Sequence, residues 1–120
     1  QVLVLLFAFL FLLRHSAVKL KGWLRRSDLL LMKRVHVYYT GLVQGIGFRF
    51  TVERITGSLG LTGWVKNLDD GGVEVVCEGG EKTLKSFLAK VDEAFKRYIK
   101  KTDIEWSRAT GEFEDFRVVF

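Results

Sequence analysis

Hydrophobic and polar positions divide the chain into two unlike parts. Residues 2–13 are all apolar, and a segment rich in arginine and lysine follows them. As a helix, the apolar run would extend about 20 Å at about 1.5 Å per residue, whereas the hydrocarbon core of a membrane is about 30 Å thick. The run is therefore too short to span a membrane by itself, but it is long enough for the apolar part of a signal peptide.

Three interpretations of residues 1–31 stay open. Met32 is the only methionine of the chain, so it can be the true start, with the preceding residues translated from upstream sequence. The segment can also be the end of a truncated signal peptide or membrane anchor, or an amphipathic extension that lies on a membrane surface. We expect an extension outside any folded domain, and we expect membrane contact, anchoring or export only through it.

The rest of the chain alternates between strand-like and helix-like patterns. The stretch 34–40 alternates polar and apolar positions and is rich in β-branched and aromatic residues, as strands are. Phe48, Val52 and Ile55 recur at helical spacing, and Gly60 follows where such a helix would end. The predicted elements are strands over 34–40, 62–67, 73–78, 103–109 and 113–120, helices over 48–59 and 81–99, a loop over 41–47 and a hairpin turn over 69–72.

This order, β-α-β-β-α-β with a short extra strand, predicts an α+β fold for a single domain over residues 32–120. It is typical of the ferredoxin-like sandwich, in which both helices cover one face of an antiparallel sheet. The same fold serves enzymes, RNA-binding domains and regulatory modules, so the function has to be argued from a site.

The net charge of +5 belongs mainly to the N-terminal segment. Residues 1–31 hold five basic side chains and one acidic one, and residues 32–120 hold fourteen basic and thirteen acidic ones. The predicted domain is thus nearly neutral, whereas nucleic-acid-binding domains usually carry a basic surface. We expect no nucleic-acid partner.

The residues that commonly bind metals are sparse and scattered. Cys77 is the only cysteine, which excludes an intrachain disulfide and a cysteine-based zinc site, and we expect it to be a buried apolar group. His15 and His36 are too far apart for a two-histidine metal motif, and the acidic residues over 69–74 suit a turn and a surface. We expect neither a metal ion nor another cofactor.

The glycine-rich loop over 41–47 has the composition of a phosphate-binding loop. Glycines allow successive backbone N–H groups to turn toward an anion, and the start of the following helix attracts negative charge. Arg49, at this helix start, offers a planar guanidinium that can donate to two phosphate oxygens. A glycine-rich connector with a surface arginine is the alternative, and the loop alone does not exclude it.

Two longer motifs resemble those of the acylphosphatase family. Residues 41–49 read Gly-Leu-Val-Gln-Gly-Ile-Gly-Phe-Arg, close to the signature of that family, and a second block over 59–74 matches at the expected distance. The resemblance covers residues 32–120. It implies metal-free hydrolysis of acyl phosphates, with Arg49 and Asn67 as catalytic residues and Asn67 orienting the attacking water. The residues implied to bind the phosphate are Gln44, Gly45, Ile46, Gly47, Phe48 and Arg49.

The resemblance also implies a simple physiological setting. We expect a cytoplasmic monomer that acts on a small acyl phosphate and whose site also accepts inorganic phosphate or sulfate. One rival is a phosphate-binding module without catalysis, like the acylphosphatase-like domain of hydrogenase-maturation proteins. Another is an RNA-binding domain of the same fold, which the nearly neutral charge of the domain disfavours.

Overall fold

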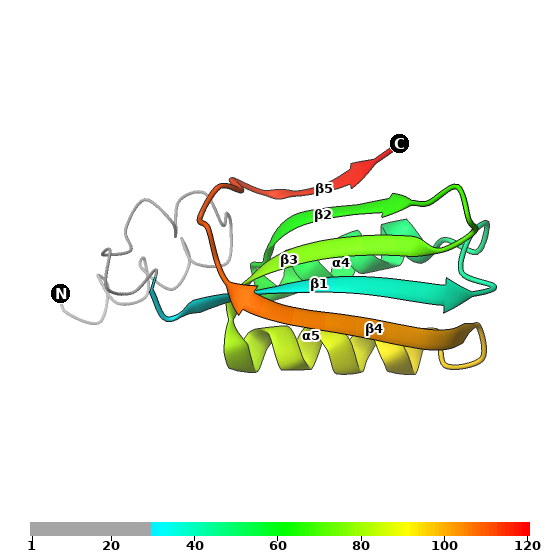
Figure 1. Cartoon of the computed structure of the whole chain (residues 1–120), viewed down its shortest axis with the longest axis horizontal. Coiled ribbons are helices and arrows are strands. Elements are labelled where there is room, and N and C mark those ends of the chain that lie inside the picture. Colours follow the sequence, from blue (N-terminus) through cyan, green and yellow to red (C-terminus); the bar gives the residue numbers. More distant parts are fainter. Residues whose placement is uncertain (1–29) are drawn as a thin grey trace, which may run out of the picture.

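The structure, a computed structural model, describes residues 30–120. The N-terminal extension expected over residues 1–31 lies almost wholly outside the described residues. Seven elements follow one another along the described part of the chain (Figure 1). They are β1 (Met32–Gly41), α4 (Phe48–Leu59), β2 (Thr62–Asn67), β3 (Val73–Gly80), α5 (Glu81–Ala94), β4 (Ile99–Arg108) and β5 (Phe116–Val119).

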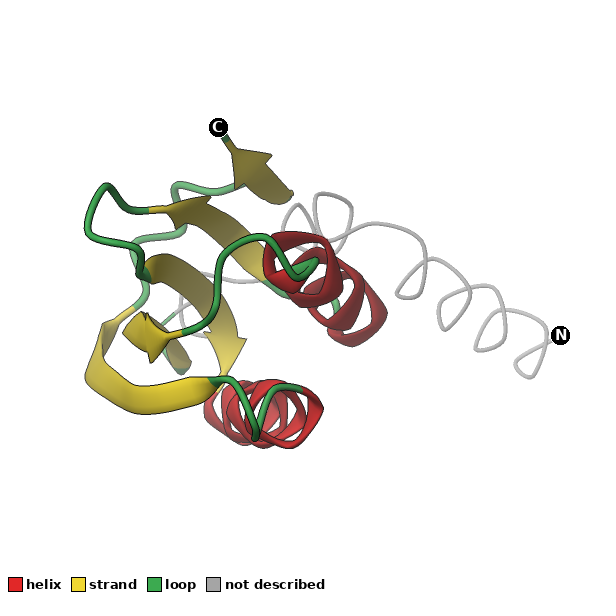
Figure 2. Ribbon diagram, turned by 90° about the vertical axis from the view of Figure 1, so that its right-hand side faces the viewer, coloured by secondary structure: helices red, strands yellow, loops and turns green. Residues whose placement is uncertain are grey.

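The strands form one five-stranded sheet in the order β4-β1-β3-β2-β5. Both helices, α4 and α5, lie on the same face of this sheet, and no other helix occurs within residues 30–120 (Figures 1 and 2). This arrangement confirms the ferredoxin-like α+β fold. The pairing is antiparallel among β4, β1, β3 and β2, as predicted, but β5 runs parallel to β2.

The sheet is therefore mixed, and the antiparallel arrangement predicted from the sequence does not extend to β5. The last residues of β4 pair with the start of β1, at the end of the sheet where β2 begins. After β4 the chain crosses this end and enters beside the start of β2, so it has to run in the same direction as β2. The strand predicted over 113–120 begins only at Phe116, because the residues before it make this crossing.

The hydrophobic core lies between the sheet and the two helices. Alternate residues of β1 point toward the helices, and Val35 and Val37 are completely buried there. From the helices, Val52, Leu84 and Phe87 fill the same layer. Burial of a side chain of this kind stabilises the fold by roughly 1.5–3 kcal/mol.

Cys77 belongs to this core and is completely buried. Burial raises the pKa of its thiol, because a thiolate would lose its hydration there. The expectation that Cys77 is a small buried group is confirmed.

The second helix ends earlier than its sequence pattern predicts. The apolar pattern continues to residue 99, but α5 ends at Ala94, and the next residue, Phe95, marks its C-terminus. The N–H groups of Tyr98 and Ile99 both donate to the Phe95 carbonyl, at 2.9 and 3.0 Å, and turn the chain back. Ile99 then pairs with Gly41 and opens β4. Strand pairing therefore overrides helical periodicity over these residues.

Glu78, only 5% exposed, holds the crossing segment between β4 and β5 to the sheet. Its carboxylate accepts from Arg34 Nε at 2.7 Å and from the backbone N–H groups of Thr110 and Gly111 at 2.9 and 3.0 Å. Hydrogen bonds to a charged acceptor of this kind contribute more than neutral ones. They fix the path by which the chain reaches β5.

Replacing Glu78 with glutamine is expected to lower the free energy of unfolding by about 2–3 kcal/mol. The amide has the same shape, but it loses the negative charge beside Arg34 and presents N–H donors to groups that are themselves donors. Urea denaturation followed by circular dichroism measures the change. Glu114→Gln, at an exposed position of the same segment, is the control and should change stability by less than about 0.5 kcal/mol. An equal loss in both variants would contradict this role of Glu78.

Candidate functional site

The loop between β1 and α4 forms a backbone cradle. Val43, at its centre, is completely buried and attaches the loop to the core. Gly45 and Gly47 have φ angles of 80° and 77°, in the left-handed region that other residues rarely adopt. Such turns direct successive N–H groups into one concavity, which suits an anion.

The start of α4 adds further donors to this cradle. The carbonyl of Gly47 accepts the first helical hydrogen bond, from Thr51 N–H at 3.1 Å, and no side chain caps the helix start. The first-turn N–H groups, including those of Arg49 and Phe50, have no partner within the helix, since its geometry provides none. The first turn also contains no acidic residue that would compete with an anionic ligand. The helix dipole and these donors therefore favour an anion here.

A small cleft of about 160 Å³ opens at this point. It brings together the cradle, the start of α4 and the end of β2. Its volume is below the roughly 300 Å³ at which sites for drug-sized ligands begin, so it suits a small group such as a phosphate. It is lined by Val43, Gly45, Gly47, Phe48, Arg49, Phe50 and Asn67.

Arg49 is held from the side of β5. Its Nη1 donates to the Val119 carbonyl at 3.4 Å, and its Cζ lies 4.7 Å from the centre of the Phe120 ring. Within residues 30–120 no carboxylate forms an ion pair with Arg49. Its positive charge is therefore oriented but not neutralised, as binding of an anion requires.

Gln44 attaches the cradle to the β2–β3 turn through its side chain. Its Nε2 donates to the carbonyls of Leu68 and Gly72, at 2.7 and 2.8 Å. The side chain is thus occupied with protein acceptors, and only the backbone N–H of Gln44 stays a candidate for phosphate. The contact also fixes the distance between the cradle and Asn67, which directly precedes Leu68.

The turn after Asn67 is itself rigid. Leu68 N–H donates to the Gly72 carbonyl at 2.8 Å, and Gly72 N–H donates to Asp70 Oδ1 at 2.9 Å. Asn67 pairs with Val73 across the hairpin. This confirms the predicted turn over 69–72, and it leaves the Asn67 side chain on a well-supported backbone at the edge of the cleft.

Three side chains of the predicted phosphate site lie elsewhere, that of Gln44 among them, and one cleft residue was not predicted. The ring of Phe48 is 2% exposed and belongs to the core, so this residue offers the cleft its backbone. Ile46 is 37% exposed and does not line the cleft. Phe50 lines the cleft but was missed. Phe50 could have been found from its place directly after Arg49 in the first helical turn.

Tyr39, near the end of β1, packs beneath the cradle and does not line it. Its ring centre lies 5.1 Å from that of Phe48, and its side chain is 1% exposed. Burial raises the pKa of its hydroxyl, so the group stays neutral. Tyr39 therefore supports the loop by packing.

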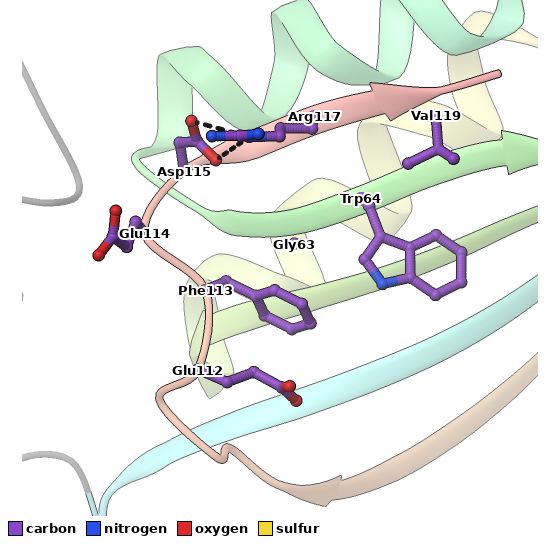
Figure 3. A pocket seen from close by; sticks show the side chains of 8 residues that line it. All are labelled: Gly63, Trp64, Glu112, Phe113, Glu114, Asp115, Arg117 and Val119. Carbon is purple, nitrogen blue, oxygen red and sulfur yellow. Dashed lines mark hydrogen bonds and ion pairs between the residues drawn. The ribbon is translucent and has the colours of Figure 1, made fainter.

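A larger pocket of about 290 Å³ lies at the other end of β2, and its character is different (Figure 3). Trp64 and Phe113 provide aromatic walls, and acidic side chains surround them. The one basic side chain in its lining, Arg117, is paired with Asp115 at 3.0 Å. An acidic lining repels anions, so this pocket does not suit a phosphate group. It is lined by Gly63, Trp64, Glu112, Phe113, Glu114, Asp115, Arg117 and Val119.

Two further properties concern only residues 30–120. No three histidine, cysteine, aspartate or glutamate side chains are grouped there so that they could hold a metal ion. Neither α4 nor α5 has the length and apolar character that a membrane crossing requires.

Comparison with known proteins identifies the family of this chain. The family model described as acylphosphatase matches residues 35–118. An acylphosphatase of Caldanaerobacter subterraneus subsp. tengcongensis is 39% identical over 90 residues, which cover 73% of this chain and 99% of that protein.

Two solved structures show the same similarity in three dimensions. The crystal structure of acylphosphatase from Bacillus subtilis superposes with a TM-score of 0.67 at 32% identity, covering 73% of this chain and 99% of that one. Full-length HypF in its phosphate- and nucleotide-bound form gives a TM-score of 0.64 at 25% identity, but only 12% of that chain is covered. Since the family model spans most of the sequence and the relative matches over nearly its whole length, this chain belongs to the acylphosphatase family.

Proposed function

We propose that this chain hydrolyses acyl phosphates to a carboxylate and inorganic phosphate. One observation carries the proposal: Arg49, with no carboxylate partner in the described part of the chain, lines the same cleft as Asn67. The cleft lies at a glycine-rich cradle and an uncapped helix start. This combination suits a phosphate group with a water molecule beside it.

The phosphate is bound by the backbone N–H groups of residues 44–48 together with Arg49. The guanidinium donates to two phosphate oxygens, and the N–H groups surround a third. Gln44 and Phe48 contribute through their backbone, because their side chains are held by the β2–β3 turn and by the core. The group is thereby fixed with its scissile bond toward the mouth of the cleft.

Asn67 orients the attacking water. Its amide can both accept from and donate to a water molecule, and it carries no charge that would repel the phosphate. The water oxygen attacks phosphorus, the bond between phosphorus and the acyl oxygen breaks, and its electron pair stays on the departing carboxylate. Positioning of this kind contributes much of the rate in phosphoryl transfer.

The reaction needs little acid–base assistance from the protein. The departing carboxylate belongs to an acid with a pKa near 4, so it leaves without being protonated. Among the described residues that line the cleft, Arg49 has the only ionisable side chain. A phosphate oxygen of the substrate therefore takes the proton of the water, and no metal ion enters the proposed mechanism.

We propose a catalytic domain over residues 32–120, a cytoplasmic monomer, and a small-molecule substrate in place of a nucleic acid. Inorganic phosphate or sulfate should compete for the cleft, because either anion offers the same oxygens to Arg49 and the cradle. The extension over residues 1–31 takes no part in the proposed chemistry.

Hydrolysis of benzoyl phosphate by the full chain in buffer with excess EDTA tests this proposal. We expect steady turnover, unchanged by the chelator and inhibited competitively by inorganic phosphate. Activity that disappears with EDTA and returns with a divalent cation would contradict the metal-free mechanism. A folded protein that binds phosphate in a calorimeter but releases no benzoate would indicate the rival function, a phosphate-binding module.

A further inference from the structure

The mouth of the cleft carries exposed apolar side chains. Phe50 lines the cleft and is 58% exposed, and Phe120, whose ring lies over Arg49, is 90% exposed. Two large aromatic side chains at one cleft leave considerable apolar surface in contact with water, which is typical of a place where an apolar ligand binds.

The same cleft offers no second positive charge. Arg49 is the one charged side chain among the described residues of its lining, and the phosphate requires it. Lys66 directly precedes Asn67 but points to the opposite face of the sheet, where its Nζ lies 3.7 Å from Glu74 Oε1. A substrate whose acyl group carries its own carboxylate or phosphate would therefore find no cation for it in the lining.

The size of the cleft decides where the acyl group lies. A volume of about 160 Å³ accommodates the phosphate and a water molecule. The acyl group then has to leave the cleft through its mouth, past Phe50 and toward the ring of Phe120. Contact with these rings removes apolar surface from water, and this favours acyl groups that are themselves apolar.

We propose that this chain prefers acyl phosphates with an uncharged, apolar acyl group, selected by Phe50 together with Phe120. This inference rests on the proposed function and specifies its substrate class. Full burial of one methylene group strengthens binding about fourfold. At this open mouth we expect about half of that burial, so kcat/KM should rise roughly twofold with each added methylene.

Kinetics with four acyl phosphates test the proposal on the full chain. From acetyl through butanoyl to hexanoyl phosphate, we expect kcat/KM to rise about tenfold or more in total. Succinyl phosphate has the same carbon count as butanoyl phosphate but ends in a carboxylate, and its kcat/KM should be at least about fivefold lower. The rise should come mainly from KM, because the acyl contacts are made before and during the reaction alike.

Phe50→Ala should reduce the ratio of kcat/KM for hexanoyl and acetyl phosphate to about threefold. Trp106→Ala is the matched control, since Trp106 is a half-exposed aromatic residue on β4, paired with Val35 away from the cleft. It should leave the ratio unchanged.

The outcomes separate this inference from the proposed function. Turnover of acetyl phosphate with equal kcat/KM for all four substrates would overturn the apolar preference and leave the hydrolysis of acyl phosphates standing. An unchanged ratio in Phe50→Ala would overturn the assignment to Phe50. If none of the four substrates were hydrolysed, the proposed function would be wrong, and this inference with it.

Discussion

Replacing Arg49 with alanine is expected to reduce kcat/KM for acyl phosphates by about 10³-fold or more. Among the described residues that line the cleft, Arg49 supplies the one positive side chain, and charge develops on the phosphate oxygens in the transition state. A loss of this size corresponds to about 4 kcal/mol of transition-state stabilisation. Steady-state kinetics on the variant and the parent chain measure it.

A lysine at position 49 separates the contribution of the planar guanidinium from that of its positive charge. Arg49→Lys keeps the positive charge but replaces a planar guanidinium, which can donate to two phosphate oxygens side by side, with a compact ammonium, so we expect a loss of at least about 100-fold. Arg54→Ala removes a cation from an exposed position of the same helix and should change kcat/KM less than about twofold. Near-normal turnover by Arg49→Lys would exclude bidentate binding of the phosphate.

Stability measurements show whether Arg49 acts only in the site. Its contact with the protein is one hydrogen bond of 3.4 Å and a ring contact with an exposed residue, both worth little to the fold. We therefore expect the urea midpoint of Arg49→Ala to stay close to that of the parent chain. A large loss of stability would indicate that Arg49 also has a structural role, and the kinetic loss could then not be assigned to phosphate binding alone.

Replacing Asn67 with alanine is expected to lower kcat by about 10²–10³-fold and to change KM by no more than a few-fold. The side chain is proposed to hold the attacking water, so it acts in the chemical step, while the cradle and Arg49 still bind the phosphate. Asp69→Asn, at an exposed position two residues further along the turn, serves as the control and should leave both constants unchanged.

A second substitution separates this role from a purely structural one. Asn67→Asp has nearly the same shape, but its carboxylate would repel the phosphate, so it should raise KM as well as lower kcat. Binding of inorganic phosphate, measured by calorimetry, should persist in Asn67→Ala and weaken in Asn67→Asp. If Asn67→Ala kept kcat within about fivefold of the parent chain, water would be oriented by another group.

Much of the fold follows from short-range patterns. The strand over 34–40 and the helix over 48–59 were predicted from alternation and helical spacing. The strand occurs as β1, which is slightly longer at both ends, and the helix occurs as α4 with the predicted bounds. These patterns are reliable because the period of a hydrophobic face depends only on the local backbone geometry.

The end of the second helix and the direction of the last strand depended on distant partners. Residues 95–99 continue an apolar helical pattern, but α5 ends at Ala94 and Ile99 pairs with Gly41 in the sheet. The parallel direction of β5 follows from where β4 ends. No local pattern contains that information, because both features depend on residues far away in the sequence.

The sequence by itself determined the fold class. Its two motifs, through their resemblance to the acylphosphatase family, also led to the proposed phosphate loop and to the two residues, Arg49 and Asn67, proposed to act there. The sequence could do so because the glycines of the loop, the start of a helix and the end of a strand are local features with recognisable residue types. Only the tertiary structure decided that the Gln44 side chain holds the β2–β3 turn and that Phe50 lines the mouth of the cleft. These roles depend on groups brought together across the fold, where distance in space, and not spacing along the chain, determines which atoms meet.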